Sequence, residues 1–168
     1  MTNPSKPLNV LFLCTHNSAR SILAEALLNV VGNGRFTAFS AGSSPRENQK
    51  PNPLGIQVLQ NAGISTDGLH SKSWDVFATP DAPQMDLIIT VCDNAAGEVC
   101  PVWPGHPATA HWGYPDPSEG NGTDEEKLEA FRKTMHAIKR RLELLCQLPR
   151  EKVERALLQD SARALSSS

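Results

Sequence analysis

The chain has 168 residues, of which 39% are apolar, and this suits one globular domain with a full-sized core. Its formal net charge of −2 and its pI near 6.2 argue against a general nucleic-acid-binding or membrane-binding surface. No run approaches the roughly 20 apolar residues that span a bilayer, and residues 1–7 lack the apolar core of a signal peptide. The sequence therefore predicts a cytoplasmic protein, in which four cysteines are free or redox-active thiols rather than a disulfide framework.

In the first half of the chain, strand patterns alternate with helix patterns. Residues 8–13 form a short apolar run typical of a buried parallel strand. Residues 19–31 follow with apolar side chains at helical spacing, until two glycines end the pattern. Residues 35–40 predict a second strand. A further helix is predicted to begin at Asn52-Pro53, because Asn is a good N-cap and Pro fits the first helical position.

The middle of the chain is less regular. A short helix is expected around residues 74–77, and the clearest central strand of the chain covers residues 85–91. A short helix over residues 93–100 comes next. After a proline-rich loop, residues 109–112 predict a fourth strand.

The last part of the chain is helical. Thr123 and Glu126 match a capping box, and the apolar residues after them recur at helical spacing as far as residue 148. Residues 150–165 predict a weaker second helix. We therefore expect one domain over residues 8–148, preceded by a disordered segment over residues 1–7 and followed by an additional helix and a disordered tail over residues 149–168.

This order of elements predicts an α/β fold, a parallel sheet with helices on both faces. Ligands of such sheets lie at the carboxyl ends of the strands. Cys14, Cys92 and the loop after Trp112 all fall at that edge.

One loop connects the first predicted strand to the first predicted helix. It reads Cys14-Thr15-His16-Asn17-Ser18-Ala19-Arg20-Ser21. Backbone amides at a helix N-terminus bind tetrahedral oxyanions, and Arg20 adds a planar contact to two oxygens. The same positive field should lower the pKa of Cys14 and favour its thiolate, to which Ser21 can donate a hydrogen bond. Residues 14–21, the oxyanion loop, are therefore predicted to bind an oxyanion above a nucleophilic Cys14.

The oxyanion loop resembles the phosphate loop of the low-molecular-weight protein tyrosine phosphatase superfamily, and within it the arsenate reductase branch. The resemblance runs from about residue 8 to residue 148. It includes the stretches Phe39-Ser40-Ala41-Gly42, Val91-Cys92-Asp93 and His111-Trp112-Gly113-Tyr114-Pro115-Asp116-Pro117. It implies a four-stranded parallel sheet flanked by helices, and an Asn17 side chain that holds the loop in shape. Many members carry glycine where this chain has His16, so we expect no positive φ there.

Asp116-Pro117 is predicted to form a rigid turn that holds a carboxyl group over the site. In the family, the matching aspartate protonates the leaving oxygen, which is general acid catalysis. Departure of hydroxide from arsenic would need the same help. A turn without a catalytic role is the alternative interpretation of this pair.

Two further cysteines favour reduction over hydrolysis. A phosphatase needs only the nucleophile, the arginine and the acid, whereas this chain adds Cys92 and Cys100. Their spacing does not suit a paired-cysteine zinc site, and no bound metal or cofactor is expected. Taking arsenate to arsenite requires two electrons, which two thiols supply by forming one disulfide. The alternative is a pair of buried structural cysteines.

The resemblance implies an order of events. Cys14 attacks arsenate and forms a covalent adduct. Cys92 then attacks the Cys14 sulfur, so that arsenite leaves and a Cys14–Cys92 disulfide remains. Cys100 next attacks Cys92, which moves the disulfide to where thioredoxin, or alternatively glutaredoxin or another thiol, reduces it. Eight residues of straight helix span about 12 Å but bridged Cα atoms lie within about 7 Å, so we expect the segment from Cys92 to Cys100 to bend or unwind on oxidation.

Two other functions compete with this interpretation. A phosphatase of this family usually carries aromatic residues just after the Asp-Pro pair, whereas Ser118-Glu119-Gly120 stands here and favours a small inorganic substrate. An oxyanion sensor would need a DNA-reading helix and a basic face, and the sequence shows neither. Glu25 and Ser40 match positions that bind potassium in some relatives, but Ser73 replaces their acidic ligand.

Overall fold

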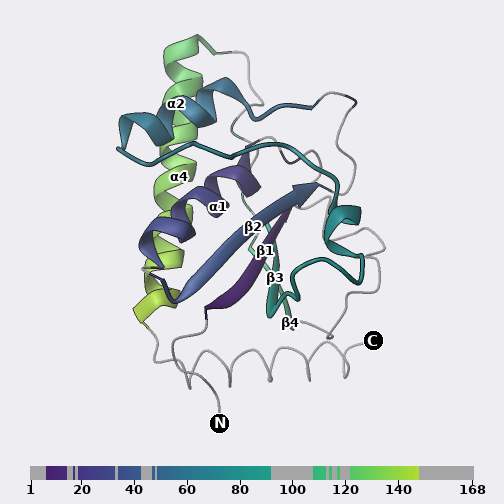
Figure 1. The fold of residues 1–168 in the computed structure, drawn as a ribbon. Helices are drawn as coiled ribbons and strands as arrows, with labels where there is room; N and C mark the ends of the chain where they lie inside the picture. Colours follow the sequence, from purple (N-terminus) through teal and green to yellow (C-terminus); the bar gives the residue numbers. More distant parts are fainter. Residues whose placement is uncertain are drawn as a thin grey trace.

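A parallel β-sheet forms the centre of the molecule (Figure 1). Its strands are β1 (Leu8–Cys14), β2 (Phe36–Gly42), β3 (Leu87–Thr90) and β4 (Ala108–His111), in the order β2-β1-β3-β4. The computed structural model describes residues 7–147 apart from 15–16, 18, 33, 43–46, 48, 92–107, 113, 115–116 and 118–121. Because every neighbouring pair of strands is parallel, all four strands end at the same edge of the sheet.

Three helices cover one face of this sheet. They are α1 (Arg20–Val31), α2 (Pro53–Asn61) and α4 (Asp124–Gln147). In Figure 1 α1 lies between the sheet and α4, and α1 contacts β1, β2 and α4. The other face carries the short 3₁₀ helix η1 (Trp74–Phe77), which packs against β2. The predicted parallel sheet flanked by helices is thereby confirmed.

Strand β1 is buried on both faces because its side chains alternate between two cores. Val10 and Phe12 pack with α1 and α4, while Leu11 and Leu13 pack with Trp74 of η1. All four β1 residues are fully buried. A central parallel strand covered on both sides is expected to be continuously apolar, which is how residues 8–13 read.

The helix starts follow the predicted capping chemistry. The Asn52 side chain accepts a hydrogen bond from the Leu54 amide at 2.9 Å, with Pro53 at the first helical position. Thr123 accepts a hydrogen bond from the Glu126 amide at 3.2 Å, which is the first of the two bonds of the predicted capping box of α4. The apolar residues of α4 then face the core, where Phe131, Met135, Ile138 and Leu142 are buried.

The helices predicted over residues 93–100 and 150–165 lie outside the described residues. So do residues 1–6 of the segment predicted to be disordered over residues 1–7, and the tail predicted to be disordered after residue 165. The division into a domain over residues 8–148 and an additional helix after it therefore stays a prediction. In the part of the chain that the structure describes, no helix is long and apolar enough to cross a membrane.

Candidate functional site

Cys14 is the last residue of β1, at the carboxyl edge of the sheet. It pairs with Gly42, the last residue of β2, and only 3% of its surface is exposed. Helix α1 begins six residues later at Arg20, and its N-cap residue is Ala19. An alanine side chain cannot accept a hydrogen bond from the first amides of the helix, so the N-cap side chain does not compete with an anion for them.

A buried hydrogen-bond network joins Cys14 to the oxyanion loop. The Sγ atom of Cys14 lies 2.9 Å from Oγ of Ser21, and Nδ2 of Asn17 donates to the same Ser21 oxygen at 2.8 Å. Ser21 can accept from Asn17 and still donate its own hydrogen to the sulfur. A hydrogen bond donated to a thiolate stabilises the charged form, so the contact between Ser21 and Cys14 suits a thiolate.

Asn17 is the residue around which the loop is held. It is fully buried and adopts a left-handed φ of 56°, which Asn tolerates better than most residues. Its Oδ1 accepts from the Lys72 amide at 2.9 Å, and its backbone carbonyl accepts from the Ser71 hydroxyl at 2.6 Å. A backbone amide can only donate, so Lys72 fixes the orientation of the Asn17 side chain. Among the described residues of the loop, Asn17 is the left-handed one, and the neighbouring His16 lies outside the described residues.

Beside this network lies a half-buried charge pair. The Lys72 ammonium is 3.9 Å from Oε1 of Glu25 and donates to the His70 carbonyl at 2.9 Å. The Ser40 hydroxyl donates to the same Glu25 oxygen at 2.5 Å. Burial raises the pKa of Glu25, and the hydrogen bond from Ser40 and the charge of Lys72 oppose this shift. Burial lowers the pKa of Lys72, and the charge of Glu25 opposes that shift. Where some relatives are expected to bind potassium, this chain therefore brings a side-chain cation to Glu25.

No group of three metal-ligating side chains comes together within the described residues. Glu25 and Ser40, the two positions that the resemblance relates to a potassium site, are in contact through the hydrogen bond that Ser40 donates. Ser73, in contrast, caps η1 and accepts from the Asp75 amide at 3.2 Å.

Arg20 is connected to the segment that follows β4. Its Nη1 donates to the backbone carbonyl of Tyr114 at 2.8 Å. The Tyr114 amide in turn donates to the Val91 carbonyl at 3.3 Å, and the Trp112 amide donates to Thr90 at 2.7 Å. The arginine of the loop and the backbone that leads towards Asp116 are therefore in direct contact.

A row of backbone hydrogen bonds crosses the carboxyl edge of the sheet. The Val91 amide donates to the Leu13 carbonyl at 2.8 Å, and Tyr114 then bonds to Val91. Leu13 immediately precedes Cys14, Val91 immediately precedes Cys92, and Tyr114 stands two residues before Asp116. The three chain segments that carry the predicted nucleophile, second thiol and acid thus approach the same edge.

The structure describes five of the predicted site residues, and it gathers them at this edge: Cys14, Asn17, Ala19, Arg20 and Ser21. Six predicted site residues lie outside the described residues, namely Thr15, His16, Ser18, Cys92, Cys100 and Asp116. Sequence reasoning missed Ser71 and Lys72 as partners of Asn17. The sequence carries no signal for them, because 54 and 55 residues separate them from Asn17.

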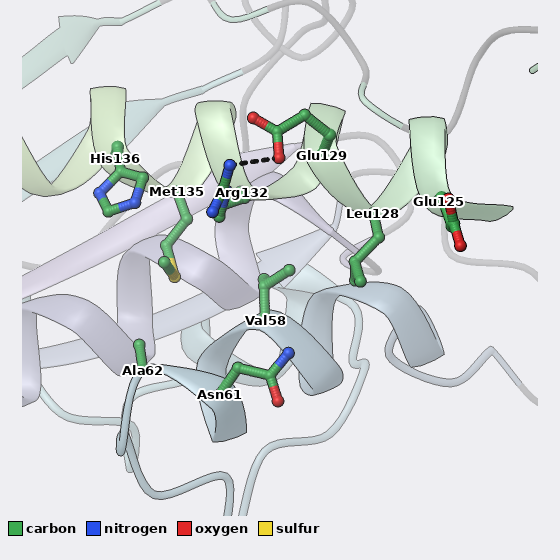
Figure 2. Close-up of a pocket in the computed structure, with 9 residues that line it drawn as sticks. All are labelled: Val58, Asn61, Ala62, Glu125, Leu128, Glu129, Arg132, Met135 and His136. Atoms are coloured by element: carbon green, nitrogen blue, oxygen red, sulfur yellow. Dashed lines mark ion pairs between the residues drawn. The ribbon is translucent and has the colours of Figure 1, made fainter. Parts of the chain in front are cut away.

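A pocket of about 420 Å³ lies elsewhere, between α2 and α4 (Figure 2). Its walls include Val58 of α2 and Leu128, Glu129 and Met135 of α4. Glu129 forms an ion pair with Arg132 at the rim, at 2.5 Å. The pocket contains no residue of the oxyanion loop, so it is separate from the site around Cys14.

Known proteins resemble this chain over most of its length. An arsenate reductase from Halalkalibacterium halodurans is 32% identical over 138 residues, which cover 82% of this chain and 94% of the relative. A solved structure described as an arsenate reductase in the phosphate-binding state is 28% identical, with a TM-score of 0.65 over 83% of this chain and 96% of the other. A thioredoxin-dependent arsenate reductase from Corynebacterium glutamicum is 26% identical, with a TM-score of 0.55 over 84% of this chain and 65% of the other.

The family assignment rests on a longer match. Residues 9–157 match the low molecular weight phosphotyrosine protein phosphatase family. This span includes the complete oxyanion loop, β1 except for its first residue, and the whole of β2, β3 and β4. The chain is therefore a member of the low molecular weight phosphotyrosine protein phosphatase family.

Proposed function

We propose that this protein reduces arsenate to arsenite, with Cys14 as nucleophile and with Cys92 and Cys100 as the thiols that supply the electrons, and that it serves arsenic detoxification in the cytoplasm. The proposal is supported by relatives named arsenate reductase that match about four-fifths of the chain. It is further supported by the network around Cys14, which suits a thiolate nucleophile.

Substrate binding is assigned to residues 14–21. Arsenate is a tetrahedral oxyanion, and the N-terminus of α1 offers amides and a partial positive charge. Arg20 supplies the charged donor, and it is held at one nitrogen by Tyr114. Its other donors then contact two arsenate oxygens.

In the first step, the Cys14 thiolate attacks arsenic and forms an S–As bond. An arsenic-bound hydroxyl group leaves with the electron pair of its As–O bond and takes a proton from Asp116, so that it departs as water. The product is a covalent arsenic(V) adduct on Cys14. No electrons have yet moved to arsenic.

In the second step, the Cys92 thiolate attacks the Cys14 sulfur. The S–As bond breaks and leaves its electron pair on arsenic, which departs as arsenite at oxidation state three. The two electrons that arsenic gains come from the two sulfurs, which are thereby oxidised to a Cys14–Cys92 disulfide. Cys100 then attacks Cys92, the Cys14 thiolate is released, and the resulting Cys92–Cys100 disulfide is reduced by an external dithiol.

The observation that carries the proposal is the hydrogen bond from Val91 to Leu13. Neighbouring strands lie about 4.8 Å apart, and the Cα atoms of a disulfide lie within about 7 Å. Because these two residues immediately precede Cys92 and Cys14, the bond supports a relay in which the two sulfurs meet. A phosphatase would have no use for a thiol at that position.

Thioredoxin is the proposed electron donor, since a relative of similar fold is described as thioredoxin-dependent. Glutaredoxin or another thiol is the alternative donor. The membership of a phosphatase family makes hydrolysis of phosphotyrosine or small phosphate esters the second candidate function. The sequence Ser118-Glu119-Gly120 after the Asp-Pro pair disfavours it, because no aromatic residue there can stack on a phosphotyrosine ring.

The test is arsenate-dependent oxidation of NADPH in the presence of thioredoxin and thioredoxin reductase. Wild type is expected to turn over, Cys92→Ser and Cys100→Ser are expected to lose steady-state turnover, and Cys100→Ser still releases one equivalent of arsenite. Cys146→Ser is the matched control, because Cys146 lies on α4 and plays no part in the relay. Steady turnover by Cys92→Ser would refute the relay, and support by glutaredoxin alone would refute the choice of donor.

A further inference from the structure

Arg141 of α4 lies over two aromatic rings from the segment that follows β4. Its guanidinium carbon is 5.2 Å from the centre of the Trp112 ring and 5.8 Å from the centre of the Tyr114 ring. A cation within about 6 Å of an aromatic face is attracted to it. Both rings are half-buried and pack against the core between the sheet and α4. Arg141 therefore holds both rings from the solvent side, where it is itself exposed.

The same segment carries the hydrogen bond to Arg20. The Tyr114 carbonyl accepts from Nη1 of Arg20 at 2.8 Å. On the other side, the backbone is held by the Thr90 and Val91 carbonyls at the end of β3. With its amide bound to the sheet and its ring held by α4, Tyr114 presents a fixed acceptor to the arginine of the oxyanion loop.

We propose that Arg141 is a positioning residue for oxyanion binding, which acts by holding the Trp112 and Tyr114 rings so that the Tyr114 carbonyl orients Arg20. The inference rests on the proposed function, in which Arg20 binds the substrate oxyanion. Arg141 itself touches neither the substrate nor the reacting atoms.

The physical reason lies in the geometry of a guanidinium. Its five N–H donors lie in one plane, so anchoring one nitrogen restricts the directions in which the others point. Binding two oxygens in parallel requires that plane to be aligned before the anion arrives. Without Arg141 the Tyr114 carbonyl is held less firmly, so this contact orients the Arg20 guanidinium less well and the anion has to complete its alignment.

The ring of Tyr114 suits this role. Burial raises the pKa of its hydroxyl, and the Arg141 charge acts in the opposite direction without cancelling the shift. The phenol is therefore neutral at physiological pH, so the contact with Arg141 is that of a cation with a neutral aromatic ring. Such a contact depends on the planar, weakly hydrated guanidinium more than on charge alone.

The test uses inorganic phosphate as a probe, with its affinity for the full-length protein measured by calorimetry. Arg141→Met keeps the apolar stem but removes the cation, and is expected to weaken phosphate binding about 2- to 10-fold. The KM for arsenate should rise by the same factor while kcat changes less. Arg141→Lys should recover only part of the affinity. Arg140→Met, one residue earlier on the same helix and exposed, is the matched control and should bind like wild type.

A second variant separates positioning from stability. In a Tyr114→Leu background the clamp has already lost a ring, so adding Arg141→Met should weaken phosphate binding by less than it does in wild type. An Arg141→Met protein that melts earlier but binds phosphate with wild-type affinity overturns the inference, as does equal loss in Arg140→Met. Failure of the proposed function would look different, because wild type would bind phosphate without reducing arsenate.

Discussion

The buried Asn17 side chain has two hydrogen-bonding partners, and a single substitution can separate their effects. Asn17→Asp keeps an acceptor for the Lys72 amide, which donates at 2.9 Å, but removes the donor to Ser21 at 2.8 Å. Ser21 is then expected to turn its hydrogen towards the new carboxylate and away from Cys14. The fold should hold while the nucleophile loses its hydrogen bond.

The magnitudes follow from the bonds that change. A hydrogen bond to a charged group is worth about 1.5–3 kcal/mol, so the thiolate should be disfavoured at least about tenfold at pH 7. Asn17→Ala acts on stability instead. It leaves a buried amide without an acceptor, at about 1–3 kcal/mol, and puts alanine at a φ of 56°, at about 1–2 kcal/mol. We expect Asn17→Ala to lower the free energy of unfolding by about 2–5 kcal/mol and Asn17→Asp to lower it by less, since Asp keeps the acceptor and tolerates the left-handed φ.

The assay measures alkylation of Cys14 by iodoacetamide between pH 5 and 9. The other three cysteines are replaced by serine, so that Cys14 is the only thiol that iodoacetamide can alkylate. Urea unfolding gives the stability of the same proteins. Ser21→Ala is the matched control, because it removes the same hydrogen bond without adding a charge. If Asn17→Asp is alkylated at pH 7 as fast as the parent protein, the assigned direction of the Ser21 hydrogen bond is wrong.

Three further predictions concern stability. Lys72→Met leaves Glu25 half-buried without its counter-charge. The pKa of Glu25 is raised in the folded state, so its ionisation destabilises the fold as the pH rises from about 4.5 through the folded value. The loss caused by Lys72→Met should therefore be small near pH 4.5 and about 2 kcal/mol at pH 7.5 by urea unfolding; a loss independent of pH would contradict the assigned pair. Gly55→Ala should raise the free energy of unfolding by up to about 1 kcal/mol, because a Cβ there would lie in ordinary contact, 3.5 Å from the Phe131 ring; a clearly lowered melting temperature would show that α2 and α4 pack more tightly. Phe131→Ala should lower the free energy of unfolding by about 3–5 kcal/mol in guanidinium unfolding, because the ring is fully buried. A loss below about 1 kcal/mol would mean that α4 moves to fill the cavity left by the ring.

Much of this fold follows from short-range patterns in the sequence. The continuous apolar run of β1 predicts a strand covered on both faces, and it lies between two cores. The caps at Asn52 and Thr123 predict the starts of α2 and α4, since both depend on side chains within three residues of the amides they bind. In the oxyanion loop, the contact between Cys14 and Ser21 was equally predictable, because one strand end and one helix start fix it.

The parts that could not be predicted depend on segments distant along the chain. The acceptor for the Lys72 amide is 55 residues away, and the carbonyl that binds Arg20 is 94 residues away. Both Arg140 and Arg141 are exposed, and nothing in the periodicity of α4 shows that only Arg141 lies over two aromatic rings among the described residues. Such contacts depend on how the loops settle once the sheet has formed, and no local rule encodes that arrangement.

The burial of β1 on both faces restricts how far its backbone can move. Its amides are bonded to β2 and β3, and slow hydrogen exchange is expected along Leu11–Leu13 because only global unfolding exposes these groups. Cys14 ends this strand, so its sulfur sits next to backbone that is bonded on both sides. In the proposed relay, Cys14 is therefore the sulfur that stays in place. Cys92 has to come to Cys14, and Cys100 has to come to Cys92.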